Sequence, residues 1–325
     1  MIITPKKLLT WINNSKNFSA IDIRPTQLQK DYSILGLKCI TSENNLFPKI
    51  KSPTVLICQY GLVTEGLIIE KNLSNTFSLL GGSEAWNEFY KSNLDLSRWS
   101  RQIILPDFGL KGQKKIMHSC VAVIGMGGLG CPSSQSLVSS GLGKLVIVDG
   151  DKIELSNLHR QPLYCLDDIG KAKVEVAKAR LNYLNKDTHI KSFNCFIDEI
   201  NGLKLLKGVD IILDATDNFE SRKKINKISK KLKIPVVYGG LYKFEGHVSV
   251  FNFKNGPSYD DIFPNSNNED DDCDTLGTLG MLSGIIGNIQ AMEAIKILVG
   301  IKDNLSGKLL IYDSINHETN IIELQ

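Results

Sequence analysis

Paired cysteines are absent from this sequence. Its seven cysteines are scattered, and no two of them form a C-x-x-C pair. That distribution argues against both a disulfide framework and a cysteine-rich zinc site. We expect most of these cysteines to be small, buried, apolar residues. Only Cys58 and Cys273 stand in surroundings that suit thiol chemistry.

The sequence also has little net charge and no targeting segment. A net charge of +3 is too small to favour nucleic acid or an anionic membrane as the main partner. The first residues turn polar before an apolar signal segment could form. Residues 279–299 are mostly apolar, but they include Asn288, Gln290, Glu293 and Lys296, and their apolar residues recur at helical spacing, which favours a buried helix over a membrane span. We therefore expect a cytoplasmic protein.

The length of 325 residues is sufficient for two domains. A first domain, residues 1–93, carries two short buried strands at residues 18–23 and 54–58, with helical segments after them. From residue 94 to residue 325, strands alternate with helices. This alternation predicts an α/β fold with a doubly wound, mostly parallel, Rossmann-like sheet.

A glycine turn follows a buried strand in the second domain. Gly125, Gly127 and Gly130 form G-x-G-x-x-G between that strand and a helix, and Gly128 lies in the same turn. Glycine permits a tight turn and a close backbone approach, while the helix N-terminus offers N–H groups to an anion. The turn alone does not distinguish a dinucleotide from a mononucleotide.

Donor side chains after the next strand favour a triphosphate. Asp149 ends that strand, where an acidic residue commonly accepts from ribose hydroxyls; its alternative role is a strand-end cap. Four donors follow it: Asn157, Arg160, Lys171 and Lys173. A redox enzyme that binds only a pyrophosphate has little need of so many donors, whereas a triphosphate and its leaving pyrophosphate require them. Lys171 also suits an exposed charge at a helix start, which we favour for it.

A further carboxylate predicts a magnesium site. Asp217 closely follows the strand at residues 209–213, at the sheet edge where open α/β sheets place their ligands. Magnesium prefers one or two carboxylates together with phosphate oxygens and water. Asp214 is the competing candidate, and its alternative role is to orient the loop by hydrogen bonds.

Seven segments carry a family resemblance. They are SRWSRQIILPDFGLKGQ, GMGGLG, SNLHRQ, DIGKAK, DATDNFESR, EGHVSVF and GNIQAMEAIKIL. In this order and spacing they resemble the ThiF/MoeB/HesA adenylyltransferases, which are similar to ubiquitin-activating enzymes. The resemblance covers about residues 97–325. In such enzymes the C-terminal Gly-Gly tail of a ubiquitin-like carrier of the ThiS/MoaD type enters beside ATP. Its carboxylate attacks the α-phosphorus, pyrophosphate leaves, and an acyl-adenylate forms.

The resemblance implies a role for each candidate residue. Gly125, Gly127, Gly128 and Gly130 approach ATP, Asp149 holds the ribose, Asn157, Arg160 and Lys173 bind phosphates, and Asp217 holds Mg2+. Arg101 looks like the arginine that one subunit lends to its neighbour's ATP, which implies a homodimer. A carboxylate is already ionised at neutral pH, so no side chain need act as a strong base.

Two features set this sequence apart from the family: the structural zinc site and the surroundings of one cysteine. Relatives usually have C-x-x-C pairs for structural zinc, but here the first pair is replaced by Ser258 and Asp261. A tetrahedral zinc needs thiolate or imidazole ligands, so we expect no structural zinc. Cys273 falls where some members form a covalent link to the carrier. Its acidic neighbours disfavour a thiolate, and a covalent role and a spectator role both stay open.

The first domain resembles a rhodanese-like domain. The matching segments are IDIR at residues 21–24, TVLIC at residues 54–58, and LLGGSEAW at residues 79–86. Cys58 stands at the sulfur-bearing position, which implies a persulfide held by backbone N–H groups and a cysteine desulfurase as a partner. Val63 replaces a common arginine. This leaves open whether the domain transfers sulfur, which we favour, or only docks a partner.

Four hypotheses follow. The first is an ATP-dependent adenylyltransferase for a sulfur carrier of thiamine, molybdopterin or related thiolation pathways. The second is adenylation of a different substrate, such as a small peptide or a modified tRNA base. The third is a non-catalytic module that binds a carrier. A nicotinamide dehydrogenase is the fourth, and the donors after Asp149 argue against it.

Overall fold

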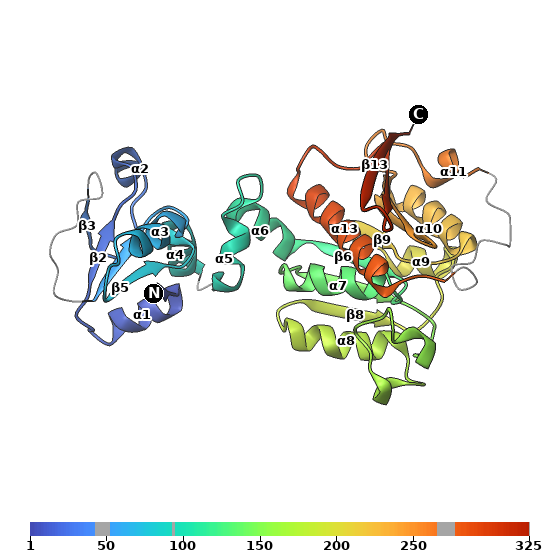
Figure 1. Cartoon of the computed structure of the whole chain (residues 1–325), viewed down its shortest axis with the longest axis horizontal. Coiled ribbons are helices and arrows are strands. Elements are labelled where there is room, and N and C mark those ends of the chain that lie inside the picture. Colours follow the sequence, from blue (N-terminus) through green and yellow to red (C-terminus); the bar gives the residue numbers. More distant parts are fainter. Residues whose placement is uncertain (43–52, 93–94, 265–276, 325) are drawn as a thin grey trace. The chain divides into compact units, whose positions relative to one another are not determined.

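The protein is described by a computed structural model covering residues 1–42, 53–92, 95–264 and 277–324. The chain divides into two compact units, Met1–Gln113 and Lys114–Gln325 (Figure 1). Both units are α/β, as the sequence predicts. The predicted domain boundary falls on residues 93 and 94, which lie outside the described residues. Residues 95–113 group with the first unit.

The first unit contains a parallel sheet of five strands in the order β1-β5-β4-β2-β3. The strands are β1 (Ile2–Ile3), β2 (Ser19–Asp22), β3 (Cys39–Thr41), β4 (Thr54–Ile57) and β5 (Thr76–Leu79). The strands β2 and β4 confirm the two that the sequence predicts. Because all five strands run the same way, their carboxyl ends meet at one edge, and Cys58 follows β4 at that edge.

Helices cover both faces of this sheet. They are α1 (Pro5–Asn13), α2 (Thr26–Asp31), α3 (Leu62–Glu70) and α4 (Gly82–Ser92), followed by η1 (Ser97–Trp99) and α5 (Ser100–Ile103). The helices α1 and α4 pack on one face through Trp11 and Trp86. The helix α3 packs on the other face, where Ile68 contacts Leu56. Neighbouring strand residues point to opposite faces, which is why β4 is buried throughout.

The second unit contains a sheet of eight strands in the order β13-β12-β11-β10-β9-β6-β7-β8. The strands are β6 (Cys120–Ile124), β7 (Lys144–Val148), β8 (His189–Phe193), β9 (Ile211–Asp214), β10 (Val236–Tyr242), β11 (Glu245–Phe251), β12 (Lys308–Asp313) and β13 (Glu318–Glu323). The strands β8, β7, β6, β9 and β10 are parallel, and the last three are antiparallel. The chain leaves β6 first toward β7 and later returns to β9 on its other side. The carboxyl end of β6 is therefore a topological switch point, where such sheets bind ligands.

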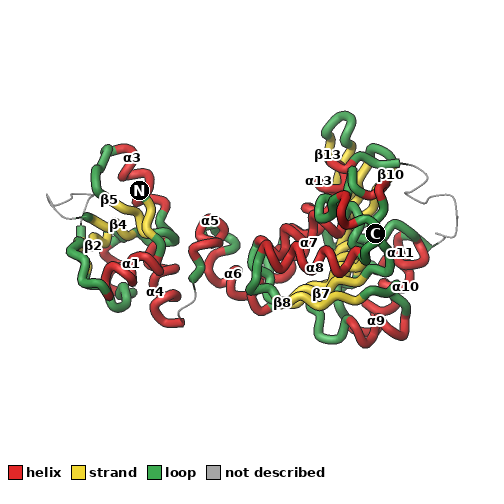
Figure 2. The backbone as a smooth tube through the Cα atoms, turned by 90° about the horizontal axis from the view of Figure 1, so that it is seen from below, coloured by secondary structure: helices red, strands yellow, loops and turns green. Residues whose placement is uncertain are grey.

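Helices lie on both faces of the second sheet (Figure 2). On one face are α7 (Gly130–Ser139), α8 (Lys173–Leu184) and α13 (Gly280–Val299). On the other are α9 (Glu199–Leu205), α10 (Phe219–Leu232) and α11 (Tyr259–Ile262), while α6 (Gly109–His118), η2 (Leu155–Asn157) and η3 (Leu166–Asp168) are connecting elements. The helix α8 begins two residues after its predicted start. Its apolar face is the predicted one, because Val174, Ala177 and Leu181 are fully buried.

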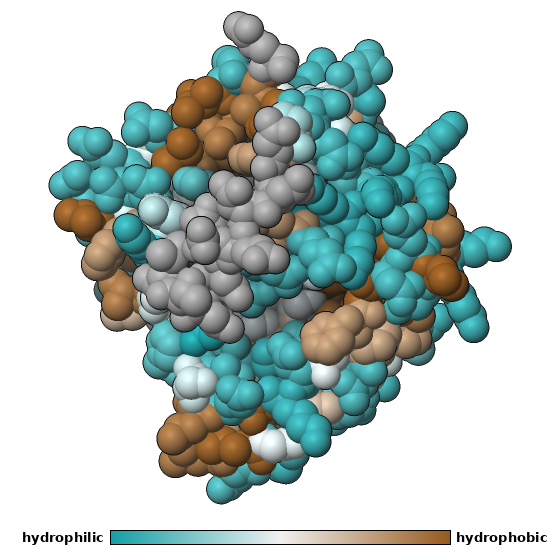
Figure 3. All heavy atoms as spheres, turned by 90° about the vertical axis from the view of Figure 1, so that its right-hand side faces the viewer, coloured by the Kyte–Doolittle hydropathy of each residue, from teal (hydrophilic) through white to brown (hydrophobic). Residues whose placement is uncertain are grey.

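The apolar helix at residues 279–299 is α13. It is long and apolar enough to cross a membrane by length and composition, and it is the one such helix in the described part of the chain. However, it packs against β10, β11 and α7, and it buries Gln290 and Glu293 in hydrogen bonds. Figure 3 shows separate hydrophobic patches on one largely hydrophilic face of the molecule. The packing of α13 and the hydrogen bonds of its buried polar side chains are those of a core helix, as predicted, although part of α13 stays exposed.

Candidate nucleotide-binding site

The glycine turn brings the backbone of β6 close to that of the neighbouring strand. Gly125 has a φ of +93°, and an added Cβ there would lie 2.6 Å from the Ala215 carbonyl oxygen. A Cβ on Gly130 would lie 1.9 Å from the Gly125 carbonyl oxygen. Side chains at these two positions would push the strand and α7 apart. The glycines therefore set the close approach of strand, turn and helix that exposes backbone N–H groups to a ligand.

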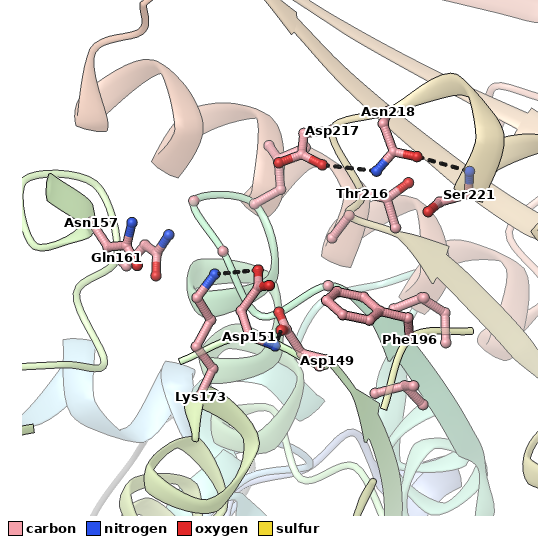
Figure 4. Close-up of a pocket in the computed structure, with 18 of the residues that line it drawn as sticks. Asp149, Asp151, Asn157, Gln161, Lys173, Phe196, Thr216, Asp217, Asn218 and Ser221 are labelled. Carbon is pink, nitrogen blue, oxygen red and sulfur yellow. Dashed lines mark hydrogen bonds and ion pairs between the residues drawn. The ribbon is translucent and has the colours of Figure 1, made fainter. Parts of the chain in front are cut away.

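A cavity of about 310 Å3 opens at the carboxyl ends of β6, β7 and β9 (Figure 4). Its volume is in the range of small-molecule sites. The residues singled out from the sequence that line it are Gly125, Gly127, Gly128, Asp149, Asn157, Arg160, Lys173 and Asp217. Gly130 begins α7 behind this lining. The cavity thus gathers residues from four separate segments of the sequence.

Asp149 is fixed by backbone donors at the centre of the cavity. Its Oδ2 accepts from the Met126 N–H at 2.6 Å, and its Oδ1 accepts from the Asp151 N–H at 2.7 Å. Burial raises the pKa of Asp149, while the Lys173 charge and the two backbone N–H groups oppose that rise. Each carboxylate oxygen has further lone pairs that can accept from a hydroxyl. The carboxylate also ties the glycine turn to the end of β7, which is the capping role given as its alternative.

Lys173 lies buried among carboxylates. Its Nζ donates to Asp151 Oδ2 at 2.9 Å, and the residue is 7% exposed. Burial disfavours the charged form, but the carboxylates of Asp149, Asp151 and Asp217 outweigh it and raise the pKa of Lys173. The ammonium therefore stays charged at neutral pH and can face an anion. Lys171, in contrast, does not line the cavity and pairs with Asp168 at 3.2 Å, as expected for an exposed helix-start charge.

The two aspartates after β9 have different surroundings. Asp217 lines the cavity, and its Oδ1 accepts from Asn218 Nδ2 at 3.2 Å. Asp214 is 2% exposed and does not line it; its Oδ1 accepts from both the backbone N–H and the hydroxyl of Thr216. Burial raises the pKa of Asp214, opposed by the charge of Arg222. Asp214 therefore orients the loop, and Asp217 is the one of the two that lines the cavity.

Arg222 supports this loop from behind. It is 7% exposed, and its Nη2 donates to the Thr216 carbonyl oxygen at 3.1 Å. Its guanidinium lies 5.1 Å from the centre of the Tyr238 ring and 5.6 Å from that of Phe219. A buried cation stacked on two rings is well placed to fix a loop.

The amide and arginine after β7, Asn157 and Arg160, both line the cavity. Asn157 is buried, and its Oδ1 accepts from the Glu154 N–H at 3.1 Å, which closes the short turn η2. Arg160 donates from Nη1 to the Ser156 carbonyl oxygen at 3.0 Å. Figure 4 shows Asn157 and Gln161 at the end opposite Phe196, with Lys173 and Asp151 between them.

Sequence reasoning missed Phe196. This side chain lines the cavity and is 70% exposed, although it is a large hydrophobic residue. Its ring lies over the backbone of Gly150, where an added Cβ would meet it at 2.8 Å. It belongs to no motif, and only its position shortly after β8 at the same sheet edge could have indicated it. Asp151 was also missed, although it stands two residues after Asp149 in the sequence.

In the first unit, Cys58 is buried at the start of a tight loop. The Gly61 N–H donates to its Sγ at 3.0 Å, and Thr64 Oγ1 lies 3.6 Å from that sulfur. Gly61 has a φ of +90°, and an added Cβ would lie 2.8 Å from the Leu79 carbonyl oxygen. The loop residues 59–64 contain no lysine or arginine, and Val63 is 59% exposed.

The two remaining candidates are not placed in the cavity. Arg101, on α5, pairs with Glu65 of α3, with Nη2 and Oε2 2.7 Å apart. Arg101 belongs to the first unit and is not among the residues that line the cavity. Cys273 lies outside the described residues, so its covalent role stays a prediction.

The turn that replaces the zinc pair is closed by hydrogen bonds. Asp261 Oδ2 accepts from both the backbone N–H and the hydroxyl of Ser258, each at 2.8 Å. These bonds lower the pKa of Asp261. Among residues 1–42, 53–92, 95–264 and 277–324, no cluster of three or more His, Cys, Asp or Glu side chains could hold a metal ion. The zinc question itself stays a prediction.

Fold and cavity together define a doubly wound α/β protein with a ligand site at its switch point. Residues 99–325 match the ThiF family. The chain belongs to that family.

Two curated relatives illustrate the match. A probable molybdopterin-synthase adenylyltransferase from Porphyra purpurea is 42% identical over 223 residues, covering 68% of this chain and 58% of that protein. Adenylyltransferase and sulfurtransferase MOCS3 from Drosophila sechellia is 43% identical over 224 residues, covering 68% and 49%. The chain thus spans about half the length of the curated relatives it matches.

Solved structures share the fold. PaaA superposes with a TM-score of 0.63 at 26% identity and covers 81% of each chain. MccB of E. coli, solved with ATP, has a TM-score of 0.62 at 24% identity and covers 70% of this chain and 71% of its own. These matches do not assign a rhodanese identity to the first unit, which stays a prediction.

Proposed function

We propose that this protein uses ATP to adenylylate the C-terminal carboxylate of a ubiquitin-like sulfur carrier that ends in Gly-Gly. The observation that carries the proposal is the convergence of Lys173, Asp149 and Asp217 beside the glycine turn in one cavity. A charged lysine held by carboxylates at a helix N-terminus suits a triphosphate with its metal ion. The family of the chain and the printed names of its curated relatives favour the same activity.

The two ends of the cavity suggest how ATP lies in it. The Phe196 ring offers an exposed aromatic face for the adenine, and Asp149 next to it accepts from the ribose. Asn157 lies at the opposite end and Lys173 between the two ends, and with Arg160, which also lines the cavity, they are the donors that we assign to the phosphates. The nucleotide then runs along the cavity from its aromatic end to its cationic end.

In the reaction, a carboxylate oxygen of the carrier forms a bond to the α-phosphorus, and the bond from that phosphorus to the pyrophosphate oxygen breaks. No proton has to be removed, because the carboxylate is ionised at neutral pH. Lys173 and Arg160 stabilise charge on the departing pyrophosphate, and the cavity holds the reactants in line. Catalysis therefore rests on positioning and charge.

Asp217 fits a magnesium ion in this scheme. Its carboxylate lines the cavity, while Asp214 is turned away and occupied by Thr216. Bound magnesium supplies charge neutralisation between phosphate oxygens. The role of this chain is to present Asp217 at a fixed place, which Arg222 secures through the Thr216 carbonyl.

Isotope exchange tests the adenylylation. Labelled pyrophosphate should enter ATP only when a ThiS/MoaD-type carrier ending in Gly-Gly is present, and Asp217→Ala should abolish that exchange. Normal exchange in Asp217→Ala would refute the metal site. Exchange with a short peptide and no carrier would favour the alternative of peptide adenylation, and ATP binding without any exchange would favour a non-catalytic carrier-binding module.

Sulfur relay through Cys58 is the second part of the proposal. The Gly61 N–H donates to the sulfur at 3.0 Å, and the Thr64 hydroxyl on α3 lies 3.6 Å from it, so the loop offers donors that suit a persulfide anion. A persulfide on Cys58 that attacks the acyl-adenylate displaces AMP and leaves the carrier joined to Cys58 as an acyl disulfide. A second thiol that attacks the Cys58 sulfur then breaks the S–S bond, releases the thiocarboxylate on the carrier and ends as a disulfide with Cys58. Mass spectrometry after incubation with a cysteine desulfurase and cysteine should show one added sulfur atom on Cys58, and an unmodified Cys58 would remove this step.

Arg101 suggests a homodimer in which each subunit completes the other's site. Its side chain is 57% exposed, so it is accessible to a second chain. The exposed side of α13, with Met281, Ile285 and Met292, offers an apolar surface for such an association. Mixing Arg101→Ala with Lys173→Ala should restore activity that neither variant has alone. If the mixture had no more activity than the two variants measured separately, the shared site would be contradicted.

We further propose that the protein acts in the cytoplasm, without a membrane or nucleic-acid partner. The six described cysteines are all free, which suits a reducing compartment. Cell fractionation would test this, and recovery in a membrane or secreted fraction would exclude it.

A further inference from the structure

Two polar side chains in the cavity have no part in the assignment of ATP. Gln161 is 2% exposed, and its Oε1 has no hydrogen-bond partner among the described residues. Thr278 Oγ1 is likewise buried without a partner in that part of the chain. Both residues line the cavity. They belong to segments more than a hundred residues apart, the loop after η2 and the approach to α13.

The backbone around Gln161 is well fixed. Its own N–H donates to the Asn157 carbonyl oxygen at 3.1 Å, and its carbonyl oxygen accepts from the Tyr164 N–H at 3.2 Å. A buried acceptor without a donor costs free energy, so such atoms in a native protein call for an explanation. A ligand that supplies the donor provides one.

The chemistry of Gln161 Oε1 points away from the nucleotide. At this end of the cavity ATP presents phosphate oxygens, which only accept hydrogen bonds and cannot satisfy an amide oxygen. A peptide group carries both an N–H and a C=O. Gln161 Oε1 can accept from the N–H, and the Thr278 hydroxyl can donate to the carbonyl oxygen.

The space beside these groups is narrow. An added Cβ on Gly128 would lie 3.0 Å from Ser283 Oγ, and one on Gly127 would lie 3.6 Å from Gln161 Nε2. At the start of α13, a Cβ on Gly280 would lie 2.3 Å from the His159 carbonyl oxygen. The glycine turn, the loop before Gln161 and the start of α13 therefore approach each other closely, which favours an extended chain without side chains.

We propose that Gln161 and Thr278 bind the main chain of a glycine-ended peptide tail, with Gln161 accepting from a tail amide N–H and the Thr278 hydroxyl donating to a tail carbonyl. This inference rests on the proposed function and assigns the tail-binding residues within it. Both are positioning residues: they hold the tail so that its carboxylate reaches the α-phosphorus.

Separate titrations of the two substrates test the assignment. Gln161→Leu keeps the side-chain size but removes the acceptor. It should raise the KM for a ThiS/MoaD-type carrier by about tenfold or more, the effect of one lost buried hydrogen bond. Affinity for ATP alone should stay within about twofold of the original protein. An unchanged carrier KM, or an equal loss of ATP affinity, would overturn the proposal.

A carrier with an ester in place of the amide at its last glycine identifies the bond directly. This carrier lacks one tail N–H, so it should bind the original protein about as weakly as the normal carrier binds Gln161→Leu. The two changes together should cost no more than either one alone. If the losses of carrier affinity from Gln161→Leu and from the ester were additive, Gln161 would not contact this N–H. The same two measurements with a carrier that has an ester at the preceding glycine then test the neighbouring amide N–H. Additivity for both esters would overturn the assignment.

Thr278 and a structural glutamine supply the controls. Thr278→Val should raise the carrier KM, and Thr278→Ser, which keeps the hydroxyl, should restore it. Gln290 is also fully buried, and its Oε1 also lacks a partner among the described residues, but it does not line the cavity, and its Nε2 donates to the Asp214 and Val237 carbonyl oxygens. Gln290→Leu should lower the melting temperature without the selective rise in carrier KM. If Gln290→Leu raised the carrier KM as selectively as Gln161→Leu, the rise in both variants would reflect a general packing effect instead. If the original protein exchanges no pyrophosphate with any carrier, the proposed function itself fails, a result distinct from unaltered tail binding in these variants.

Discussion

The loops after β4 and after β6 stand at equivalent places in their sheets, yet they are equipped for different chemistry. Each follows a buried central strand, turns at a glycine with positive φ, and leads into a helix. Beside the β6 loop, charged side chains from other segments converge on a cavity. The β4 loop instead encloses a thiol, and its residues 59–64 carry no cation. Under the proposed function, the same backbone design serves phosphate in one unit and sulfur in the other, according to the side chains that surround it.

The largest expected effect distinguishes Lys173, the first residue of α8, from Lys171, two residues before it. Lys173→Ala should lower pyrophosphate exchange on the order of 100-fold, because it removes a buried cation from the phosphate end of the cavity. Lys171→Ala should change exchange by less than about twofold, since that lysine pairs outside the cavity. Equal losses in the two variants would show that general positive charge, and not the converging site, distinguishes the β6 loop.

The aromatic end of the cavity gives the next effect. Phe196→Ala should raise the KM for ATP by about tenfold to a hundredfold, as stacking of a base on an aromatic ring contributes about 1–3 kcal/mol. Phe196→Trp should stay close to the original value. Tyr183 is 89% exposed on α8 and does not line the cavity, so Tyr183→Ala is the matched control. An unchanged KM for ATP in Phe196→Ala would place the base elsewhere.

The part of the candidate site that lies in sequence motifs could be predicted from the sequence. The glycine turn, Asp149 and Asp217 were predicted because each stands at or shortly after the end of a strand in a parallel sheet, whereas Lys173 was singled out by the family resemblance. Parallel strands bring such positions to one edge whatever their separation along the chain. The family resemblance supplied their roles.

Contacts between distant segments were not predictable in this way. The pairing of Lys173 with Asp151 and the position of Phe196 over Gly150 depend on how loops pack, and no periodicity records that. The strands β12 and β13 were also missed. Every residue of β13 is exposed, so its sequence lacks the alternation of apolar and polar residues by which a half-buried strand is recognised.

A carboxylate that serves only the fold gives a smaller effect and a reference for the functional ones. Asp261→Asn weakens the cap on the Ser258 turn and should lower the free energy of unfolding by about 1 kcal/mol at neutral pH. Because folding lowers the pKa of Asp261, its contribution is complete above the unfolded pKa of about 3.9 and is lost as the pH falls below it.

Urea unfolding of Asp261→Asn and the original protein should therefore show a gap at pH 7 that narrows toward pH 3. Pyrophosphate exchange at pH 7 should be the same in both proteins. A gap that is constant with pH would mean that the carboxylate charge does not contribute to the cap.

The smallest expected effect concerns a charge beside the β4 loop. Glu65 stands in the first turn of α3, directly after that loop, and it holds Arg101. Exposed pairs of this kind contribute about 0–1 kcal/mol, so Glu65→Gln should barely change stability, and the small change should vanish at high salt. If Arg101 serves the ATP of a neighbouring subunit, releasing it from Glu65 should lower the KM for ATP by no more than about fivefold, the most that such a pair can oppose. A fall in activity as large as that of Arg101→Ala would mean that the glutamate holds the arginine in its working position. In that case the β4 loop and the β6 loop would be linked through this ion pair and would not be independent sites.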